Sequence, residues 1–139
     1  MKLLKFVRDR SAIETVEAAI VMPIAILVML ATINLGLVVF GQQAVQSAAR
    51  HGARMGSVAQ VCPACYAVRE ARGAIENAGI VQNPGVAILS AGGGAGSILK
   101  IRVTGEVPNF FGGLSGLFPG LPSGPFRLNG EATFRQEGW

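Results

Sequence analysis

The sequence has few charged residues and almost none of the side chains on which enzymes depend. Charged residues make up 14% of the 139 positions, against roughly 25% in an average soluble protein. The chain contains one histidine, so a Ser-His-Asp or Cys-His site has little support, and no paired acid and base constellation is visible. We therefore predict a protein that is not an enzyme, with no catalytic residue and no cofactor.

Basic charge is scarce beyond the N-terminus, although the formal net charge is +4. The first twelve residues hold most of it, with Lys2, Lys5, Arg8 and Arg10 against Asp9. From Ile13 onward the chain has 8 basic and 7 acidic residues. A nucleic-acid-binding protein carries a basic stripe on its folded domain, so no nucleic-acid partner is predicted. The basic leader instead indicates membrane topology.

Cysteine is confined to one Cys62-Pro63-Ala64-Cys65 unit, which leaves four interpretations open. A structural disulfide at the start of a helix is the preferred one. A redox site would follow a βαβ pattern, which is absent. Zinc needs four ligands, and the chain offers two thiols and a distant His51, which we interpret as a surface residue. Unpaired thiols are the fourth possibility, and no metal site is predicted.

A long run without charge extends from Ala18 to Phe40. As a helix its 23 residues would be roughly 35 Å long, enough to cross a hydrocarbon core of about 30 Å. A buried core helix is the alternative, but the rest of the chain is too short to surround a helix that is apolar on every side. A cleaved secretory signal would have a shorter apolar core. We predict a transmembrane helix.

The flanks of this run predict its orientation and one functional residue. Four basic residues precede the run, whereas Arg50 and Arg54 lie well beyond it. The N-terminus is therefore expected in the cytoplasm and the C-terminal part outside it. Glu14 suits a helix N-terminus, where the backbone amides are positive. Glu17 lies directly against the apolar run, where an unpartnered charge costs a few kcal/mol, so we predict a functional role for it.

Small residues recur every four positions after the membrane run, at Ala44, Ala48, Gly52 and Gly56. Each glycine costs about 1 kcal/mol relative to alanine inside a helix. That cost is explained if the row is a packing face, because small side chains let helix backbones approach closely. The partner is either the chain's own domain or a neighbouring copy. The nearby Arg50 and Arg54 are either a solvated stripe or donors to acidic partners.

The chain is expected to contain one anchored domain of the α+β class. Residues 1–12 form a basic cytoplasmic leader, residues 13–60 a long helix with a transmembrane segment at 18–40, and residues 61–139 a small extracytoplasmic domain. In this domain we predict one helix at 62–79. It covers an antiparallel sheet of three or four strands, with strands at 86–90, 98–107 and 127–136. Leu99, Ile101 and Val103 alternate with polar residues and predict one apolar face.

Two glycine-containing segments separate these strands. The tract Ala91–Ser97 is a flexible hairpin loop and not a phosphate loop, because no Gly-Lys-Ser/Thr follows it. The segment between Val107 and Phe126 is long for a loop in a compact domain. It carries six large apolar residues (Phe110, Phe111, Leu114, Leu117, Phe118 and Leu121). It either folds back over the small core or forms an exposed contact for partner subunits or the membrane surface.

Two motifs resemble those of a known family. A basic leader is followed by the small Ala12, then four residues, then Glu17, with Pro23 six residues further on. A second motif contains Gln42-Gln43 and the sequence AARHGAR at residues 48–54. In this order and separation they resemble the TadE-like pseudopilins of tight-adherence (Flp/Tad-type) pilus systems. The C-terminal half is similar to the family only in outline.

The resemblance implies processing and assembly. A prepilin peptidase would cleave between Ala12 and Ile13. Glycine usually precedes the cut, so alanine there implies slower cleavage or none. Glu17 would then pair with the N-terminal amine of a neighbouring subunit, and such a pair is cheaper in lipid than a lone charge. Pro23 removes a backbone hydrogen bond and bends the helix, which we interpret as easing its transfer from lipid into a helical bundle.

We therefore predict a TadE-like minor pilin that assembles or primes a type IV-like pilus used in adhesion or secretion. Its expected partners are other pilin subunits, the prepilin peptidase, the inner-membrane assembly platform and membrane lipid. Its expected location is the inner membrane and then the pilus. A major filament subunit is one alternative, although such subunits are typically much shorter in these systems. A signal-anchored binding or redox protein that never polymerises is another.

Overall fold

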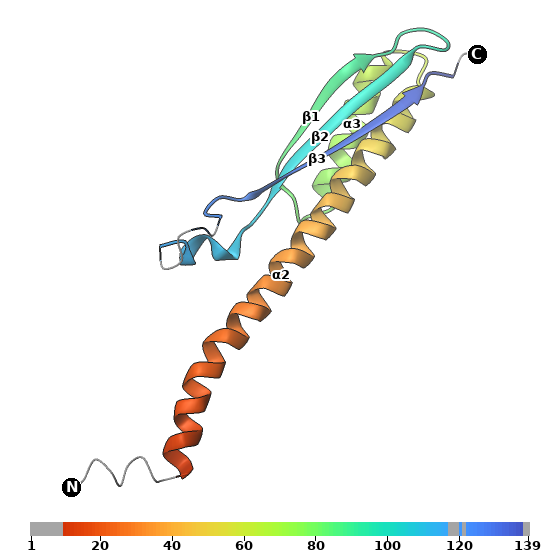
Figure 1. The fold of residues 1–139 in the computed structure, drawn as a ribbon. Coiled ribbons are helices and arrows are strands. Elements are labelled where there is room, and N and C mark those ends of the chain that lie inside the picture. The colour runs from red at the N-terminus through yellow and green to blue at the C-terminus, as the bar shows by residue number, and fades with distance from the viewer. Residues whose placement is uncertain (1–9, 117–119, 121, 138–139) are drawn as a thin grey trace, which may run out of the picture. The chain divides into compact units, whose positions relative to one another are not determined.

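The computed structural model describes residues 10–116, 120 and 122–137. Lys2, Lys5, Arg8 and Asp9 of the expected leader lie outside the described residues, as do Leu117, Phe118 and Leu121 of the long loop. The elements follow in the order α2 (Arg10–Ser57), α3 (Pro63–Asn77), β1 (Gln82–Ala91), β2 (Ile98–Val107), the 3₁₀ helix η1 (Phe110–Leu114) and β3 (Phe126–Arg135) (Figure 1).

Helix α2 is 48 residues long and contains a single proline, Pro23. The chain divides into two compact units, residues 1–33 and residues 34–139, and α2 contributes residues to both. Among the described residues, one helix, at Ile13–Ser57, is long and apolar enough to cross a membrane. That helix is therefore a candidate membrane anchor.

The second unit contains an antiparallel sheet in the order β1-β2-β3. Strands β2 and β3 pair without a break from Ile98 opposite Arg135 to Val107 opposite Phe126. On β2 the side chains alternate as the sequence predicts: Leu99, Ile101 and Val103 are fully buried, whereas the residues between them point to the other face. The α+β class, the long apolar helix and a three-stranded antiparallel sheet are thus confirmed.

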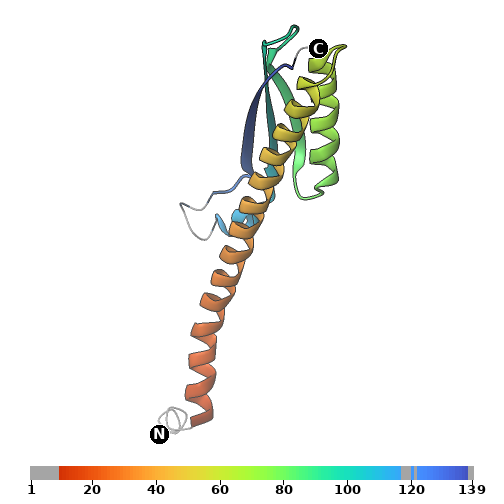
Figure 2. The same ribbon diagram turned by 90° about the vertical axis from the view of Figure 1, so that its right-hand side faces the viewer.

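The core lies between this sheet and two helices, the C-terminal part of α2 and α3 (Figure 2). It is built largely from alanine on the helices and from branched aliphatic residues on the strands (Val45, Ala48, Ala49, Ala53, Ala67, Ala71, Ile75, Leu99, Ile101, Val103, Val107, Leu128 and Ala132). Alanine has no flexible side chain, so the helices pack closely without losing rotamer entropy. The outcome is a two-layer domain with a thin core.

Each edge strand of the sheet has a feature that disfavours pairing with a further strand. On β3, the backbone oxygens of Asn129 and Glu131 accept hydrogen bonds from Nε2 of Gln42 (2.7 Å) and Nε2 of Gln46 (2.9 Å). These glutamines are four residues apart, so they lie on one face of α2. The β1 edge instead carries Pro84, which has no amide hydrogen to donate.

Strand β1 is longer than the expected 86–90. It begins at Gln82, and its pairing with β2 shifts between Gln82 and Gly85 and again between Ile88 and Ser90. Asn83 has a φ of 49°, a left-handed conformation that asparagine tolerates better than most residues. Such a bulge keeps the strand paired through the proline, and the sequence pattern alone did not indicate this.

Candidate assembly and membrane-facing surface

The N-terminal part of α2 presents apolar side chains on every side of the helix. Of the apolar window that qualifies as a candidate span, 11% is buried. The large apolar residues that remain more than two-fifths exposed in this part are numerous (Ile13, Val16, Ile20, Val21, Met22, Ile24, Ile26, Val28, Met29 and Ile33). Exposure to water costs about 25 cal/mol for each Å² of apolar surface. A cover of lipid or of other helices is therefore required.

Glu17 lies within this apolar surface. Its side chain is exposed, and its helical neighbours Val16 and Ile20 are 60% and 62% exposed. No cationic side chain in the part of the chain that the structure describes forms an ion pair with it. A carboxylate in this position needs a partner from another molecule once water is removed.

The expected processing site and Pro23 also lie in α2. The helix begins at Arg10, so the backbone of Ala12 and of Ile13 is helical. Pro23 lies inside the same helix, and the helical backbone continues on both sides of it. Membrane helices tolerate such a proline. The structure thus places Glu17 and Pro23 on one helix, six residues apart.

The small-residue row of α2 contacts the chain's own domain. Ala48 is 1% exposed, and Ala44 packs against the buried core. A Cβ atom added to Gly52 would lie 2.5 Å from the backbone oxygen of Ala67, and one added to Gly56 would lie 2.7 Å from that of Pro63. Of the two packing partners that the sequence leaves open, the row therefore packs against the chain's own domain, and Gly52 and Gly56 contact α3.

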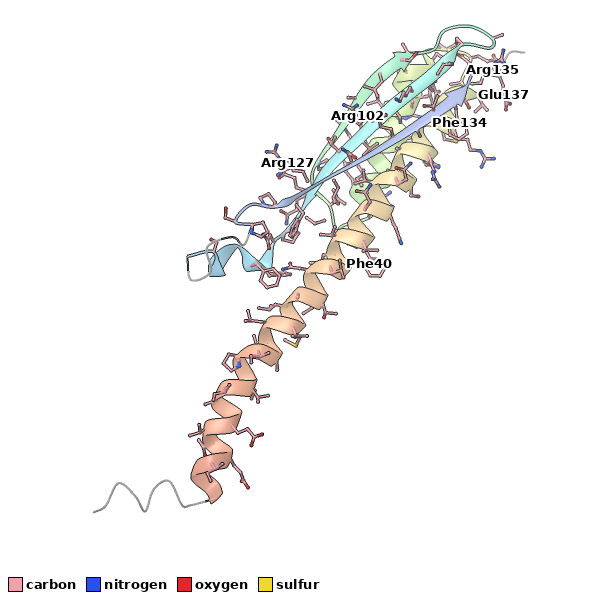
Figure 3. All side chains as sticks on the ribbon, in the orientation of Figure 1. Phe40, Arg102, Arg127, Phe134, Arg135 and Glu137 are labelled. Carbon is pink, nitrogen blue, oxygen red and sulfur yellow. A yellow bond between two sulfur atoms is a disulfide. The ribbon has the colours of Figure 1, made fainter. Side chains whose placement is uncertain are left out.

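Arg50 and Arg54 lie on the solvent side of α2. Together with His51 they line a shallow depression, whose other walls are Gln43, Gln46, Ser47 and Phe134 of β3. Phe134 is labelled on β3 in Figure 3. Neither arginine forms an ion pair with any described residue. Nε2 of His51 lies 3.9 Å from Oε2 of Glu70, and its side chain is 52% exposed. The two guanidinium groups are thus available to an acidic partner or to solvent.

A disulfide joins Cys62 and Cys65 at the start of α3. Cys62 has a φ of 49° and immediately precedes the helix. Its backbone oxygen accepts hydrogen bonds from the amides of Cys65 (3.0 Å) and Tyr66 (3.2 Å). The disulfide therefore ties the left-handed residue to the first helical turn.

No group of three or more metal-binding side chains occurs among the residues that the structure describes.

The outer face of the sheet is polar and carries one three-residue charge cluster. Glu131 lies 2.7 Å from Nζ of Lys100 and 2.6 Å from a guanidinium nitrogen of Arg102. The hydrogen bond from Lys100, followed by that from Arg102, lowers the pKa of the Glu131 carboxyl below its ordinary value. Because these side chains are partly exposed to solvent, which screens the charges, the cluster contributes little to stability.

Asn34 is a residue whose role the sequence analysis missed. It lies in α2, is 4% exposed, and its Oδ1 accepts a hydrogen bond of 3.1 Å from the amide of Phe110. No described residue accepts a hydrogen bond from its Nδ2. The sequence does contain a signal for this residue, because Asn34 is the single amide side chain between Ala18 and Phe40. A buried amide in an apolar run requires a hydrogen-bond partner, and its spacing could not reveal which one.

Comparisons with known proteins agree with these features. The family model described as TadE-like protein matches residues 14–54, a range that contains Glu17, Pro23 and the Gln42–Arg54 motif. No curated protein and no solved structure matches the chain. The TadE-like pilin family is structural and non-enzymatic. Membership of that family generally implies that other pilus subunits are the binding partners. Residues 14–54 are thus a TadE-like segment, which confirms the resemblance found in the sequence and suggests a pilin-like protein associated with a Tad pilus.

Proposed function

We propose that the chain is a minor pilin that primes or joins a Tad-type filament through the N-terminal part of α2. The observation that carries this proposal is the exposed apolar surface of α2 with Glu17 inside it. Lipid can cover the apolar side chains, but it offers no strong partner to a carboxylate embedded among them. A neighbouring helix that supplies a cation would satisfy both needs at once.

The cation that fits best is a free N-terminal amine on a neighbouring subunit. Cleavage between Ala12 and Ile13 by a prepilin peptidase would create such an amine four residues before Glu17. An amine and a carboxylate that pair in a medium of low dielectric constant also compensate each other's loss of hydration. In this proposal the N-terminus is cytoplasmic, α2 spans the inner membrane, and residues 61–139 face the outside before the subunit enters the filament.

The domain of the chain supports a minor role more than that of the major subunit. In the systems that this sequence resembles, major subunits are typically much shorter. A sheet domain on every subunit would also surround the filament with bulk that helix packing does not need. We therefore assign the domain to the tip or the initiation complex. The chain itself would not be an enzyme, and the assembly platform of the inner membrane would be its third partner.

The test replaces Glu17 with alanine and uses Glu14→Ala as its control, because both side chains are exposed carboxylates near the start of α2. We expect Glu17→Ala to remain in the membrane at normal abundance and to disappear from sheared filaments. Glu14→Ala should enter filaments normally. Immunoblots of the two fractions provide the measurement, and normal entry of Glu17→Ala would remove the proposal.

Two further measurements separate the alternatives. Quantitative mass spectrometry of sheared filaments gives the copy number, and stoichiometric abundance would indicate a major subunit. N-terminal sequencing of the same material reports whether Ile13 is the first residue. A protein that never polymerises would be absent from filaments. If its Cys62–Cys65 pair also exchanged with a dithiol substrate and its deletion left piliation intact, the binding or redox alternative would replace the proposal.

A further inference from the structure

The segment after β2 returns to the helix that carries the apolar run. The amide of Phe110, the first residue of η1, donates to Oδ1 of Asn34 at 3.1 Å. Both residues belong to the same compact unit, residues 34–139. Because Asn34 is 4% exposed, the contact excludes water and holds η1 against α2 at a defined position along the helix axis.

That position lies within the apolar run and not beyond it. Asn34 precedes Phe40, the last residue of the run, by six residues, which corresponds to about 9 Å along a helix. The first side-chain hydrogen bond from α2 to the sheet comes later, where Gln42 donates to the backbone oxygen of Asn129. The polar sheet thus begins where the apolar run ends, whereas η1 lies alongside the last part of the run itself.

The chemistry of this segment suits such a depth. Residues 108–126 contain no charged side chain. The amide hydrogen of Phe111, the second residue of η1, is satisfied by Oδ1 of Asn109 at 3.0 Å, and the amide of Gly112 donates to the backbone oxygen of Asn109. Satisfied backbone groups lower the cost of leaving water. Phe110 nevertheless remains 49% exposed.

We propose that η1 is a second membrane contact, in which the Phe110 side chain enters the outer leaflet beside α2. This inference rests on the membrane anchor proposed above and adds the surface by which the domain is seated on the bilayer. Asn34 is the positioning residue, because its Oδ1 holds the amide of Phe110 at that depth.

Lipid fits this surface better than a partner subunit does. In the same part of α2, Leu35, Val39 and Phe40 are 66%, 46% and 60% exposed. Like Phe110 they are apolar and exposed, and residues 18–40 and 108–126 contain no charged side chain. A protein interface usually gains specificity from charged side chains. The charged residues that flank the segment 108–126 in the sequence are Glu106 and Arg127, whose side chains lie 3.4 Å apart.

The experiment uses the full chain in vesicles of phosphatidylcholine that carries bromine at defined depths, which quenches tryptophan fluorescence by contact. Trp139 is the single tryptophan and is replaced with phenylalanine. Three variants then each carry one new tryptophan: Phe110→Trp is the η1 probe, Ile24→Trp the anchor probe and Ile98→Trp the domain probe. Ile24 and Ile98 are 58% and 55% exposed, so they are matched control positions for the anchor and for the far end of the domain.

We expect the η1 probe and the anchor probe to be quenched by bromine at a similar depth within the acyl chains, because Asn34 and Ile24 each lie five residues, about 7.5 Å, from the midpoint of residues 18–40. The domain probe should be quenched by bromine at no depth. Quenching of the anchor probe without quenching of the η1 probe would overturn this inference and leave the anchor intact. Absence of quenching in both would overturn the anchor as well. If emission of the η1 probe moves to shorter wavelength only when other pilins are added, the partner is a protein and the lipid contact is refuted.

Two additional measurements distinguish loss of the membrane contact from misfolding of a variant. Asn34→Leu, added to the chain with the η1 probe, should weaken its quenching severalfold, and the same change should leave quenching of the anchor probe unaltered. Equal quenching of the η1 probe with and without Asn34 would overturn the positioning role. In the unaltered protein, a phospholipid with a photoreactive acyl chain should crosslink to residues 109–116, and peptide mapping that finds lipid on α2 alone would contradict the inference.

Discussion

At Gly52 the backbones of α2 and α3 approach so closely that no side chain fits between them. Gly52→Ala would place a methyl group 2.5 Å from the oxygen of Ala67 and 2.5 Å from the Cβ of Ala71, both in α3. We expect a loss of about 1–3 kcal/mol in the free energy of unfolding, because the helices must separate. Chemical unfolding in detergent micelles, followed by circular dichroism, measures it.

The matched control is Gly73→Ala in α3. A Cβ atom at Gly73 meets nothing within 4 Å, so the change gives only the helix-forming advantage of alanine. It should stabilise the domain by about 0.5–1 kcal/mol. If Gly52→Ala also stabilised the domain, the glycine would not be needed for helix contact, and the packing described for α2 and α3 would be incorrect.

Glu131 provides a prediction about pH. Its hydrogen bonds from Lys100 and then from Arg102 lower its pKa in the folded protein. The stabilisation from this cluster is therefore complete above the pKa of the unfolded chain, and it is lost as the pH falls through the lower, folded value. Removing the first cause with Lys100→Met should raise the pKa of Glu131 toward its ordinary value.

Carbon-detected NMR titration of the side-chain carboxyl of Glu131 measures this change. The control is Arg127→Met, because that guanidinium lies beside Glu106 and not beside Glu131. An unchanged pKa of Glu131 in Lys100→Met would show that the lysine does not hold the carboxylate in solution.

At the scale of elements, α2 closes the open edge of β3 with two glutamine side chains. Gln46→Met keeps the length of the side chain and removes its donor, so the backbone oxygen of Glu131 loses its partner. We expect a loss of about 0.5–1.5 kcal/mol in unfolding free energy. The control is Gln43→Met. The amide of Gln43 is exposed and forms no hydrogen bond with any described residue, so this substitution should change the free energy of unfolding by less than about 0.5 kcal/mol. Equal losses would contradict the role of Gln46.

The same elements show what the sequence can predict. The alternation of Leu99, Ile101 and Val103 indicates the buried face of β2, because side chains in a strand alternate with a period of two. The start of β1 was missed, because Pro84 normally argues against a strand and only a bulge at Asn83 accommodates it. The four-residue spacing of Gly52 and Gly56 predicts a packing face, but spacing carries no information about which helix will fill it.

The same limit applies to the candidate site. Glu17 could be predicted, because a carboxylate beside an apolar run is costly whatever the tertiary structure. Asn34 was missed, because its hydrogen-bond partner Phe110 is 76 residues away in the sequence. A residue whose role depends only on the apolar run around it can be predicted from the sequence. A residue whose role depends on a contact with a distant part of the chain can be identified only from the structure.

For the whole molecule, two isoleucines of similar exposure should behave differently. Ile24→Lys places a charge on the apolar surface of α2, five residues from the midpoint of residues 18–40. The cost of a lysine at the centre of a membrane helix, about 2.5–3.5 kcal/mol, is the upper limit for this position. We expect this variant to be extracted by alkaline carbonate more readily than the unaltered protein. Ile98→Lys, on the domain, should remain in the membrane pellet. Identical extraction of both variants would argue that α2 is not the anchor.

The two edges of the sheet bear on whether a second chain can add a strand to it. On one edge, the backbone oxygens of Asn129 and Glu131 accept hydrogen bonds from Gln42 and Gln46. The other edge carries Pro84 and two irregular pairings. Both features disfavour the addition of a strand from a second chain, which is how amyloid-like stacks grow. In the proposed assembly, contact between copies would then depend on the exposed apolar surface of α2 and not on added strands.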